Sequence, residues 1–285
     1  MKNPKLALLI GIFCISLFPV LVKATPVSGL SSAFYRMAIA FALLLPIVLF
    51  KKKLEKPNTR TAWIIVLCGI CFGSDIAVWN IAIQKSTATQ ATLLTNLAPI
   101  WVGLGMFFFL PEKPNRNFWI GAFLALVGMV VLIGTETFYQ FKFDIGFVFG
   151  ILSGVFYAIY MLLSKYVLRQ MSSLSFITYS MAVSSLFIGG ICLVYKQPFF
   201  GFSTSVWGVL VVQGIVCQLI AWTLLSYVTQ KMEANRVSLS LLSQVLVTSL
   251  IAWLFLGEII TLQMLIGGLI ILIGIGITFY KTKES

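Results

Sequence analysis

The sequence predicts an all-α membrane protein with ten transmembrane helices, arranged as two inverted five-helix repeats. Of its 285 residues, 60% are hydrophobic and only 10% are charged, whereas a soluble protein carries roughly 25% charged residues. The chain therefore has too few polar side chains to cover a surface that faces water. Its apolar residues fall in segments whose lengths approach the roughly 20 residues that an α-helix needs to cross a bilayer.

Ten segments of this kind are expected to span the membrane. In chain order they are residues 6–23, 29–50, 61–83, 87–110, 118–134, 144–168, 173–195, 204–229, 233–257 and 261–280. The first could be mistaken for a signal peptide, but it lacks a convincing small-residue cleavage site and opens a regular series of apolar segments. It is therefore expected to be retained as a helix. No connection between segments is long enough to form a separate domain.

A repeat relates the two halves of the chain. Adding 146 to the residue number turns Gln84-Lys85 into Gln230-Lys231 and Glu112 into Glu258, without a gap. The same shift relates further pairs: Ala88 and Ala234, Leu93 and Leu239, Phe109-Leu110 and Phe255-Leu256, Ile120-Gly121 and Ile266-Gly267, Leu126 and Leu272, Gly128 and Gly274. The polar residues and glycines carry more weight than the leucines. The sequence therefore predicts two repeats, residues 1–140 and 141–285.

The basic residues predict the orientation. If the N-terminus lies inside, 15 of the 20 Lys and Arg residues fall on the inner side and Arg36 lies within a helix. The outer connections then hold only Lys23, Lys85, Lys142 and Lys196. Because cytoplasmic segments carry an excess of Lys and Arg, both termini are predicted to face the cytoplasm. Five helices per half place the start of the second repeat on the opposite side, so the repeats are inverted.

Several other functions are disfavoured by composition and motifs. The net charge of +12 resembles that of nucleic-acid-binding proteins, but the basic residues lie between apolar segments, where they set orientation. The chain has no His, and its five cysteines lie in apolar segments, so Cys68 and Cys71 are predicted to be small buried residues rather than metal ligands or a redox pair. Neither a cofactor nor a nucleic-acid partner is expected.

Enzyme and channel motifs are also missing from the sequence. It holds no phosphate-binding Gly-Lys-Ser/Thr loop and no cluster with metal-ligand spacing. Glu112 and Glu258 lie at helix ends, where they suit caps or contacts between the halves better than catalysis. A channel would call for a ring of matching charged residues, which the sequence does not show. No enzymatic activity is therefore expected.

Three stretches carry a family resemblance: Phe34-Tyr35-Arg36, the run from Ala88 to Pro99, and Leu256-Gly257-Glu258. With ten helices in two repeats, the whole chain resembles EamA-like members of the drug/metabolite transporter superfamily. The first half departs from the pattern, reading Leu110-Pro111-Glu112 where the family usually has Gly before Glu. The resemblance implies a carrier of small metabolites. Some members export amino acids, nucleobases or drugs, and others take up metabolites such as S-adenosylmethionine or choline.

Ionisable side chains within spanning helices are candidate sites, because burying a charge in a bilayer is costly. Arg36 and Asp75 are both predicted to lie roughly 10–12 Å below the outer surface, at about 1.5 Å per residue. Asn96 falls at a similar depth. Asp75 either binds substrate or a proton, or forms a structural ion pair with Arg36. For Arg36 the structural role is favoured, because the resemblance places its helix at the edge of the cavity.

Amides and aromatic rings complete the predicted substrate cavity. Gln218 and Trp222 repeat the spacing of Asp75 and Trp79 in the other half. Each tryptophan either lines the cavity or is packed or lipid-facing. Aromatic faces with a few polar groups suit an amphipathic organic substrate, and flat rings attract cations.

Three further residues join this cavity by position. Gln244 lies two residues from position 242, which matches Asn96 under the 146-residue shift, and Tyr157 and Tyr160 add hydroxyl-bearing rings. Small residues spaced four apart, Gly146, Gly150 and Gly154, form a ridge that lets another helix approach, either in the same chain or in a partner.

The sequence thus predicts a carrier in the inner (cytoplasmic) membrane that moves a small amphipathic metabolite by alternating access. Export of amino acids or related metabolites is favoured, on family resemblance. Uptake of a nucleoside-like metabolite such as S-adenosylmethionine is the alternative within transport. A non-transporting scaffold is the alternative of another class, and the polar residues at mid-depth argue against it. The expected partners are the metabolite and the lipid bilayer, and the chain is expected to act as a monomer or homodimer.

Overall fold

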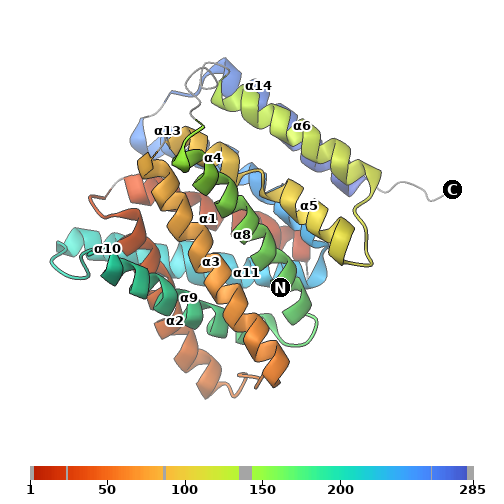
Figure 1. Cartoon of the computed structure of the whole chain (residues 1–285). Helices are drawn as coiled ribbons and strands as arrows, with labels where there is room; N and C mark the ends of the chain where they lie inside the picture. The colour runs from red at the N-terminus through yellow and green to blue at the C-terminus, as the bar shows by residue number, and fades with distance from the viewer. Residues whose placement is uncertain (1–2, 24, 86–87, 135–142, 258, 281–285) are drawn as a thin grey trace. The chain divides into compact units, whose positions relative to one another are not determined.

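The computed structural model describes residues 3–23, 25–85, 88–134, 143–257 and 259–280, and within them every regular element is helical (Figure 1). Ten stretches in these residues are long and apolar enough to cross a membrane, which confirms the predicted all-α class and the ten spans. They are Pro4–Val22, Gly29–Phe50, Thr59–Ala82, Gln90–Phe109, Arg116–Ile133, Ile145–Val167, Ser173–Val194, Thr204–Lys231, Ala234–Leu256 and Leu262–Phe279.

The helices group into two compact units, and each unit draws on both halves of the sequence. The first unit consists of Met1–Ala77 and Leu163–Met232, and the second of Val78–Leu162 and Glu233–Ser285. The chain passes from one unit to the other within α3, within α8 and between α11 and α12. The predicted repeats, residues 1–140 and 141–285, therefore each contribute helices to both units.

The first unit is built from α1 and α2, most of α3, the end of α8, α9, and a long span in which a π-helix, η1, joins α10 to α11. Their bounds are α1 Pro4–Lys23, α2 Gly29–Phe50, α3 Thr59–Lys85, α8 Ile145–Val167, α9 Ser173–Val194, α10 Thr204–Val212, η1 Gln213–Ile220 and α11 Ala221–Lys231. Serine side chains cap three of them: Ser28, Ser172 and Ser203 each accept a hydrogen bond from a backbone N–H of the first turn.

Glycines set the close packing of α3 against α9 in this unit. A methyl group at Gly69 would lie 2.5 Å from the Val183 side chain, and one at Gly73 would lie 2.6 Å from Phe187. Ser184 donates a hydrogen bond of 2.9 Å to the Gly69 carbonyl. Small residues at a helix contact allow this approach between membrane helices.

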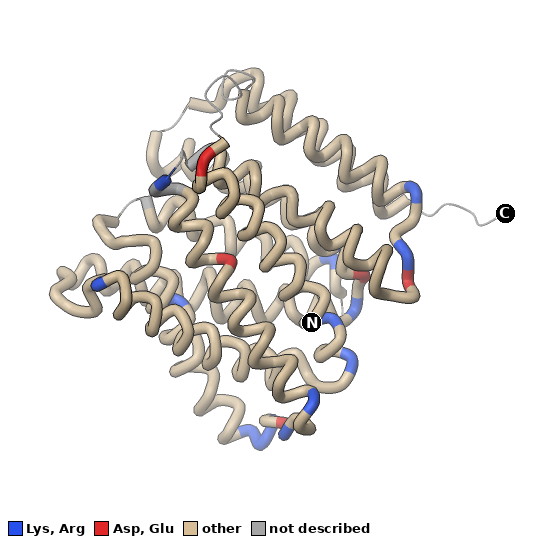
Figure 2. Tube along the Cα trace, in the orientation of Figure 1, with Lys and Arg blue, Asp and Glu red and all other residues tan. Residues whose placement is uncertain are grey.

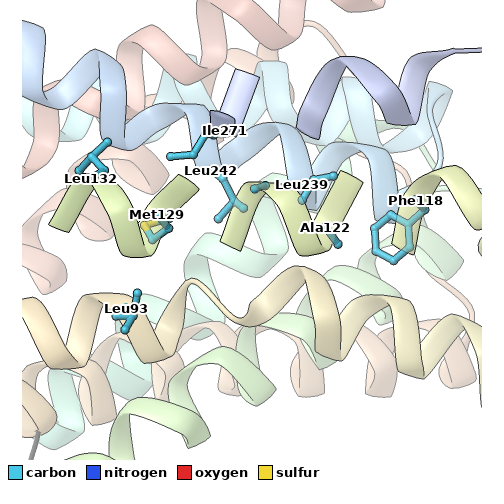
Figure 3. Packing of buried hydrophobic residues seen from close by; sticks show 9 residues of the cluster. Leu93, Phe118, Ala122, Met129, Leu132, Leu239, Leu242 and Ile271 are labelled. Atoms are coloured by element: carbon cyan, nitrogen blue, oxygen red, sulfur yellow. The ribbon is translucent and has the colours of Figure 1, made fainter. Parts of the chain in front are cut away.

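The second unit holds the end of α3, most of α8, and the helices that run from α4 to α6 and from α12 to α14. The bounds not yet given are α4 Ala88–Thr95, α5 Ala98–Phe109, α6 Arg116–Ile133, α12 Ala234–Ser240, η2 Leu241–Ser243 (a 3₁₀ turn), α13 Gln244–Leu256 and α14 Leu262–Phe279. A buried apolar cluster joins α4, α6, α12, η2 and α14, with Leu93, Phe118, Met129 and Ile271 among its members (Figure 3).

In this unit α6 and α14 lie side by side (Figure 1) and touch through glycines. A methyl group at Gly128 would lie 2.7 Å from the Gly267 carbonyl oxygen, and one at Gly274 would lie 2.6 Å from that of Gly121. The helices are therefore antiparallel. The 146-residue shift relates Gly121 to Gly267 and Gly128 to Gly274. The contact of Gly128 with Gly267 therefore corresponds to the contact of Gly274 with Gly121 when the two halves of the sequence are exchanged. A two-fold axis between the helices would produce this reciprocity.

The fourth and ninth spans are interrupted, whereas the sequence predicts a continuous helix in each. The two breaks match: α5 begins at Ala98 and α13 at Gln244, which is 146 residues later. In the fourth span, Pro99 lies in the first turn of α5, where its missing N–H and its ring oppose continuation from α4.

The ninth span has no proline at its break. Instead, the Ser240 hydroxyl donates to the Arg236 carbonyl and the Ser243 hydroxyl to the Ser240 carbonyl, both at 2.7 Å. Serine bonds of this kind to the preceding turn bend helices. Hydropathy alone shows neither break, because the mean hydropathy of both spans stays in the range of membrane-spanning helices.

The ends of these two spans explain the departure from the family pattern. Gly257 ends α13 in the left-handed region, with φ 68°, which suits Gly because it has no Cβ. The matching residue in the first half is Pro111, and there α5 ends on Leu110 in an extended conformation. The first half therefore stops its helix with proline and the second with glycine.

Lys and Arg gather at helix ends and in the connections (Figure 2), while Arg36 is buried within α2. The predicted orientation depends on this distribution and stays a prediction. Glu258 and Lys142 lie outside the described residues, as do Lys2, Lys281 and Lys283.

Candidate substrate-binding site

The eight residues predicted to line the substrate cavity, together with Arg36, fall in both units. The first unit holds Arg36, Asp75, Gln218 and Trp222. The second holds the other five: Trp79, Asn96, Tyr157, Tyr160 and Gln244.

Arg36 is the buried cation of the first unit. Its side chain is 5% exposed, and the guanidinium lies 4.0 Å from the centroid of the Phe18 ring, in a cation–π contact. It is within electrostatic reach of the Asp75 carboxyl and the Cys217 thiol. The Nε–H has no hydrogen-bond acceptor. The unit therefore holds a buried positive charge with an unused donor.

Asp75 lies on α3 in the same unit and is 8% exposed. Removing one partner from a buried pair of opposite charges leaves the other charge uncompensated, which is strongly destabilising. The proximity of Asp75 to Arg36 thus lowers the cost of burying both groups.

The π-helix η1 brings two amides into this unit. Gln213 and Gln218 are both 0% exposed. The Gln213 Oε1 accepts a hydrogen bond of 2.6 Å from the Ser32 hydroxyl, while its Nε2 has no partner. Neither amide atom of Gln218 has a partner, and the hydroxyl of Thr223 is likewise buried and unpaired.

Gln213, Thr223 and the π-helix were not anticipated from the sequence. The available signal is the spacing of the two glutamines, which are five residues apart in an otherwise apolar segment. A π-helix closes i→i+5 hydrogen bonds, so residues five apart come to one face, and π-helical turns are frequent at functional sites.

Trp222 is buried in the same unit. Its ring packs against Phe72 with centroids 4.5 Å apart and an interplanar angle of 61°. Edge-to-face packing of this kind holds both rings in place.

In the second unit Asn96 lies at the break between α4 and α5. It is buried, and its Nδ2 lies 3.9 Å from the Met129 sulfur. Beside it, the Thr95 hydroxyl donates to the Ser153 hydroxyl at 3.0 Å. A methyl group at Gly154 would lie 3.1 Å from the Thr95 carbonyl oxygen. Part of the predicted glycine ridge thus packs within the chain, against the end of α4.

The aromatic residues of this unit lie further along α8 and on α5. Tyr157 and Tyr160 have ring centroids 6.3 Å apart, and Tyr160 is the more buried. Trp101 was not predicted from the sequence as a site residue. Its indole N–H is buried without an acceptor, and its ring lies against Gly154.

The last two predicted residues, Gln244 and Trp79, are half-buried. Gln244 is the first residue of α13, beside the break in the ninth span. The described residues contain no group of three or more His, Cys, Asp or Glu side chains that could hold a metal ion.

Comparison with known proteins finds similarity along most of the chain. The profile of the EamA-like transporter family matches residues 4–134 and 144–280. A solved crystal structure with 18% sequence identity superposes with a TM-score of 0.83 and covers 98% of this chain and 97% of its own, which shows the shared fold.

Several relatives carry transporter names. An "Uncharacterized transporter" of Archaeoglobus fulgidus is 26% identical over 88% of both chains. "Uncharacterized transporter YdfC" of Bacillus subtilis is 25% identical over 88% of this chain and 82% of its own. An "S-adenosylmethionine uptake transporter" of Rickettsia prowazekii is 23% identical over 54% of this chain and 51% of its own.

Proposed function

Since the chain belongs to the EamA-like transporter family, we propose that it exports amino acids or related small metabolites by alternating access. The family and the ten spans make it a multi-pass membrane transporter of small molecules. The observation that carries the proposal is the group of buried polar side chains within spanning helices, foremost Arg36, Asp75 and Gln218. Polar groups at such depth are costly, and in membrane proteins they mark substrate and ion pathways.

Alternating access requires two halves that can exchange roles, and two features support an inverted repeat. The glycine contacts between α6 and α14 are reciprocal under the 146-residue shift. The fourth and ninth spans break at matching residues, before Ala98 and Gln244. Discontinuous helices at corresponding positions of two halves commonly form transporter binding sites. The repeats proposed are residues 1–140 and 141–285.

The proposed substrate cavity is lined by Asp75, Trp79, Asn96, Tyr157, Tyr160, Gln218, Trp222 and Gln244. In this proposal Asp75 binds an amine or a proton, and Arg36 supplies the coupled charge. The aromatic residues face the apolar part of the substrate, and the amides orient its polar part. The carrier is proposed to lie in the cytoplasmic membrane with both termini inside, as a monomer or homodimer.

Uptake of S-adenosylmethionine is the second candidate. It is favoured by the Rickettsia prowazekii relative, whose name states that substrate and direction and which matches about half of this chain. S-adenosylmethionine has an amino acid end and an aromatic base, so the same polar and aromatic groups suit both candidates.

Transport by purified protein in liposomes tests the proposal. Vesicles are loaded with one unlabelled L-amino acid or with S-adenosylmethionine, and uptake of the same labelled compound is measured. The proposal expects accumulation by exchange for at least one amino acid, above protein-free vesicles. Exchange of S-adenosylmethionine alone would favour the second candidate, and no exchange with any compound would contradict both.

A further inference from the structure

The helices α2 and η1 run side by side in the first unit. The Ser32 hydroxyl bonds to Gln213 at 2.6 Å, and four residues further along each helix Arg36 is within electrostatic reach of Cys217. The contact is close, since a methyl group at Gly214 would lie 2.7 Å from the Ile39 side chain. The helices are therefore parallel here. The five-residue spacing of the π-helix puts Gln218 on the same face as Gln213.

The two helices together carry four buried polar atoms that lack partners. They are the donors Arg36 Nε, Gln213 Nε2 and Gln218 Nε2, and the acceptor Gln218 Oε1. Most buried side-chain polar atoms in proteins are hydrogen-bonded, because a buried unpaired group bears its full desolvation penalty. Four such atoms on two adjoining helices indicate that something else satisfies them during the protein's working cycle.

The excess of hydrogen-bond donors over acceptors among these atoms indicates which ligand group would satisfy them. The four atoms are three N–H donors, one of them on a cation, and a single acceptor. An ammonium or metal cation would need several acceptors, and these two helices offer only one. A carboxylate has two oxygens with about four lone-pair sites and is bound strongly by arginine and by amide N–H groups. The Phe18 ring, 4.0 Å from the Arg36 guanidinium, covers it without offering a competing oxygen.

We propose that Arg36, Gln213 and Gln218 form a subsite that binds the carboxylate of the transported molecule. This rests on the proposed transport function and narrows the substrate class to small metabolites that carry a carboxylate. Asp75, within electrostatic reach of Arg36, is placed to attract an amine on the same molecule. Amino acids and S-adenosylmethionine share this amino-carboxylate end, so the subsite serves either candidate.

Matched ligand pairs test the subsite in the purified full-length protein. Each L-amino acid is compared with its carboxamide, and S-adenosylmethionine with its decarboxylated form. The dissociation constant of each ligand is obtained from the rise in Tm with ligand concentration. We expect carboxylates to bind at least roughly 30-fold more tightly than their partners. This ratio of dissociation constants corresponds to the smallest loss of binding free energy usually seen when one partner of a buried charge pair is removed.

The variant Gln218→Leu separates a binding role from a structural one. It removes two unpaired buried atoms at similar volume, so Tm without ligand should hold or rise, while the carboxylate preference should fall. Gln230→Leu on the neighbouring α11 is the matched control. The Gln230 amide donates to the Leu168 and Met171 carbonyls at 2.9 and 3.3 Å, so its loss should lower Tm and leave the preference intact.

Two results would overturn the subsite alone: wild-type protein that binds carboxylates and carboxamides equally, or Gln218→Leu protein that keeps the full preference. A wild-type protein that binds none of these probes contradicts the proposed substrate classes themselves, and the subsite with them. Failure of the subsite is thereby distinguished from failure of the transport proposal.

Discussion

At the residue scale, the first unit places opposite charges together in an apolar setting. Arg36 and Asp75 are buried on neighbouring segments of the chain's first three spans and interact electrostatically. Such a pair either holds two helices together or takes part in binding. The Arg36 Nε and the Gln218 amide, in the same unit, are both unpaired and favour binding, because a purely structural pair is stable only when its remaining hydrogen-bonding positions are filled.

Asp75→Asn distinguishes these roles. If Asp75 serves a substrate amine or a proton, the variant should fold normally but lose transport or its response to pH, and adding Arg36→Gln should not restore it. If the pair is structural, Asp75→Asn should reduce folded yield, and the double variant should recover it. Proteoliposome transport across a pH series and size-exclusion profiles measure both. Full transport with unchanged pH dependence in Asp75→Asn would end the binding role.

Two tryptophans on matching helices should respond differently to truncation. Trp222 is buried against Phe72, so Trp222→Ala should destabilise the protein by about 3–5 kcal/mol. Trp79 is half-buried, and Trp79→Ala should weaken substrate binding with little change in Tm. Thermal unfolding and ligand titration of both variants measure this. Unchanged transport in Trp79→Ala would remove that residue from the cavity.

At the element scale, the contact between α6 and α14 depends on glycine rather than on large side chains. The backbone of each helix touches glycines of the other, so a larger side chain at these glycines would clash with the backbone of the neighbouring helix. The same 146-residue shift links these glycines and the breaks of the fourth and ninth spans. Reciprocal contacts and matching breaks at one constant shift are what the proposed duplication would produce.

Gly128→Ala and Gly267→Ala should each destabilise the protein, by roughly 1–3 kcal/mol for an overpacked contact. Gly276→Ala, also on α14, is the matched control, because nothing lies within 4 Å of its added methyl group. There the substitution should be neutral or slightly stabilising, since Ala favours helix over Gly. Thermal unfolding in detergent gives the comparison. Equal Tm values for all three variants would contradict the close contact.

The sequence predicted the spans well and their interior irregularities poorly. The second span was placed at residues 29–50, where α2 lies, because hydropathy and flanking polar residues define such ends. The breaks at Ala98 and Gln244 and the π-helix at Gln213 were not foreseen. Proline and serine are also tolerated within continuous membrane helices, so Pro99, Ser240 and Ser243 did not by themselves predict the breaks. The hydrogen bond from Ser32 to Gln213 was not foreseen either, because it joins residues that are 181 positions apart in the sequence.

At the scale of the whole molecule, sequence order and spatial grouping differ. Each compact unit takes helices from both halves, and the chain crosses between units three times, at Ala77, Leu162 and Met232. Hydropathy cannot show this grouping, because it reports each span alone. The units also divide the predicted site residues, with Asp75 in the first and Trp79 in the second.

The proposed topology can be checked with reporter fusions. Fusions after Lys53 and Lys165 should report a cytoplasmic location, and one after Lys196 an outer location, because basic residues mark the inner side. A cytoplasmic signal from Lys196 would contradict both the orientation and the inverted repeat.

Accessibility of position 218 tests the central claim, that a buried polar site opens alternately to the two sides. The five native cysteines are replaced by alanine, Gln218→Cys is introduced, and membrane-impermeant maleimide is applied to either face of oriented vesicles. We predict labelling from both faces, with substrate shifting the balance between them. Leu225→Cys, at a packed position on α11, should stay unlabelled. A thiol at 218 that reacts from neither face in vesicles with measured transport would contradict alternating access to this site.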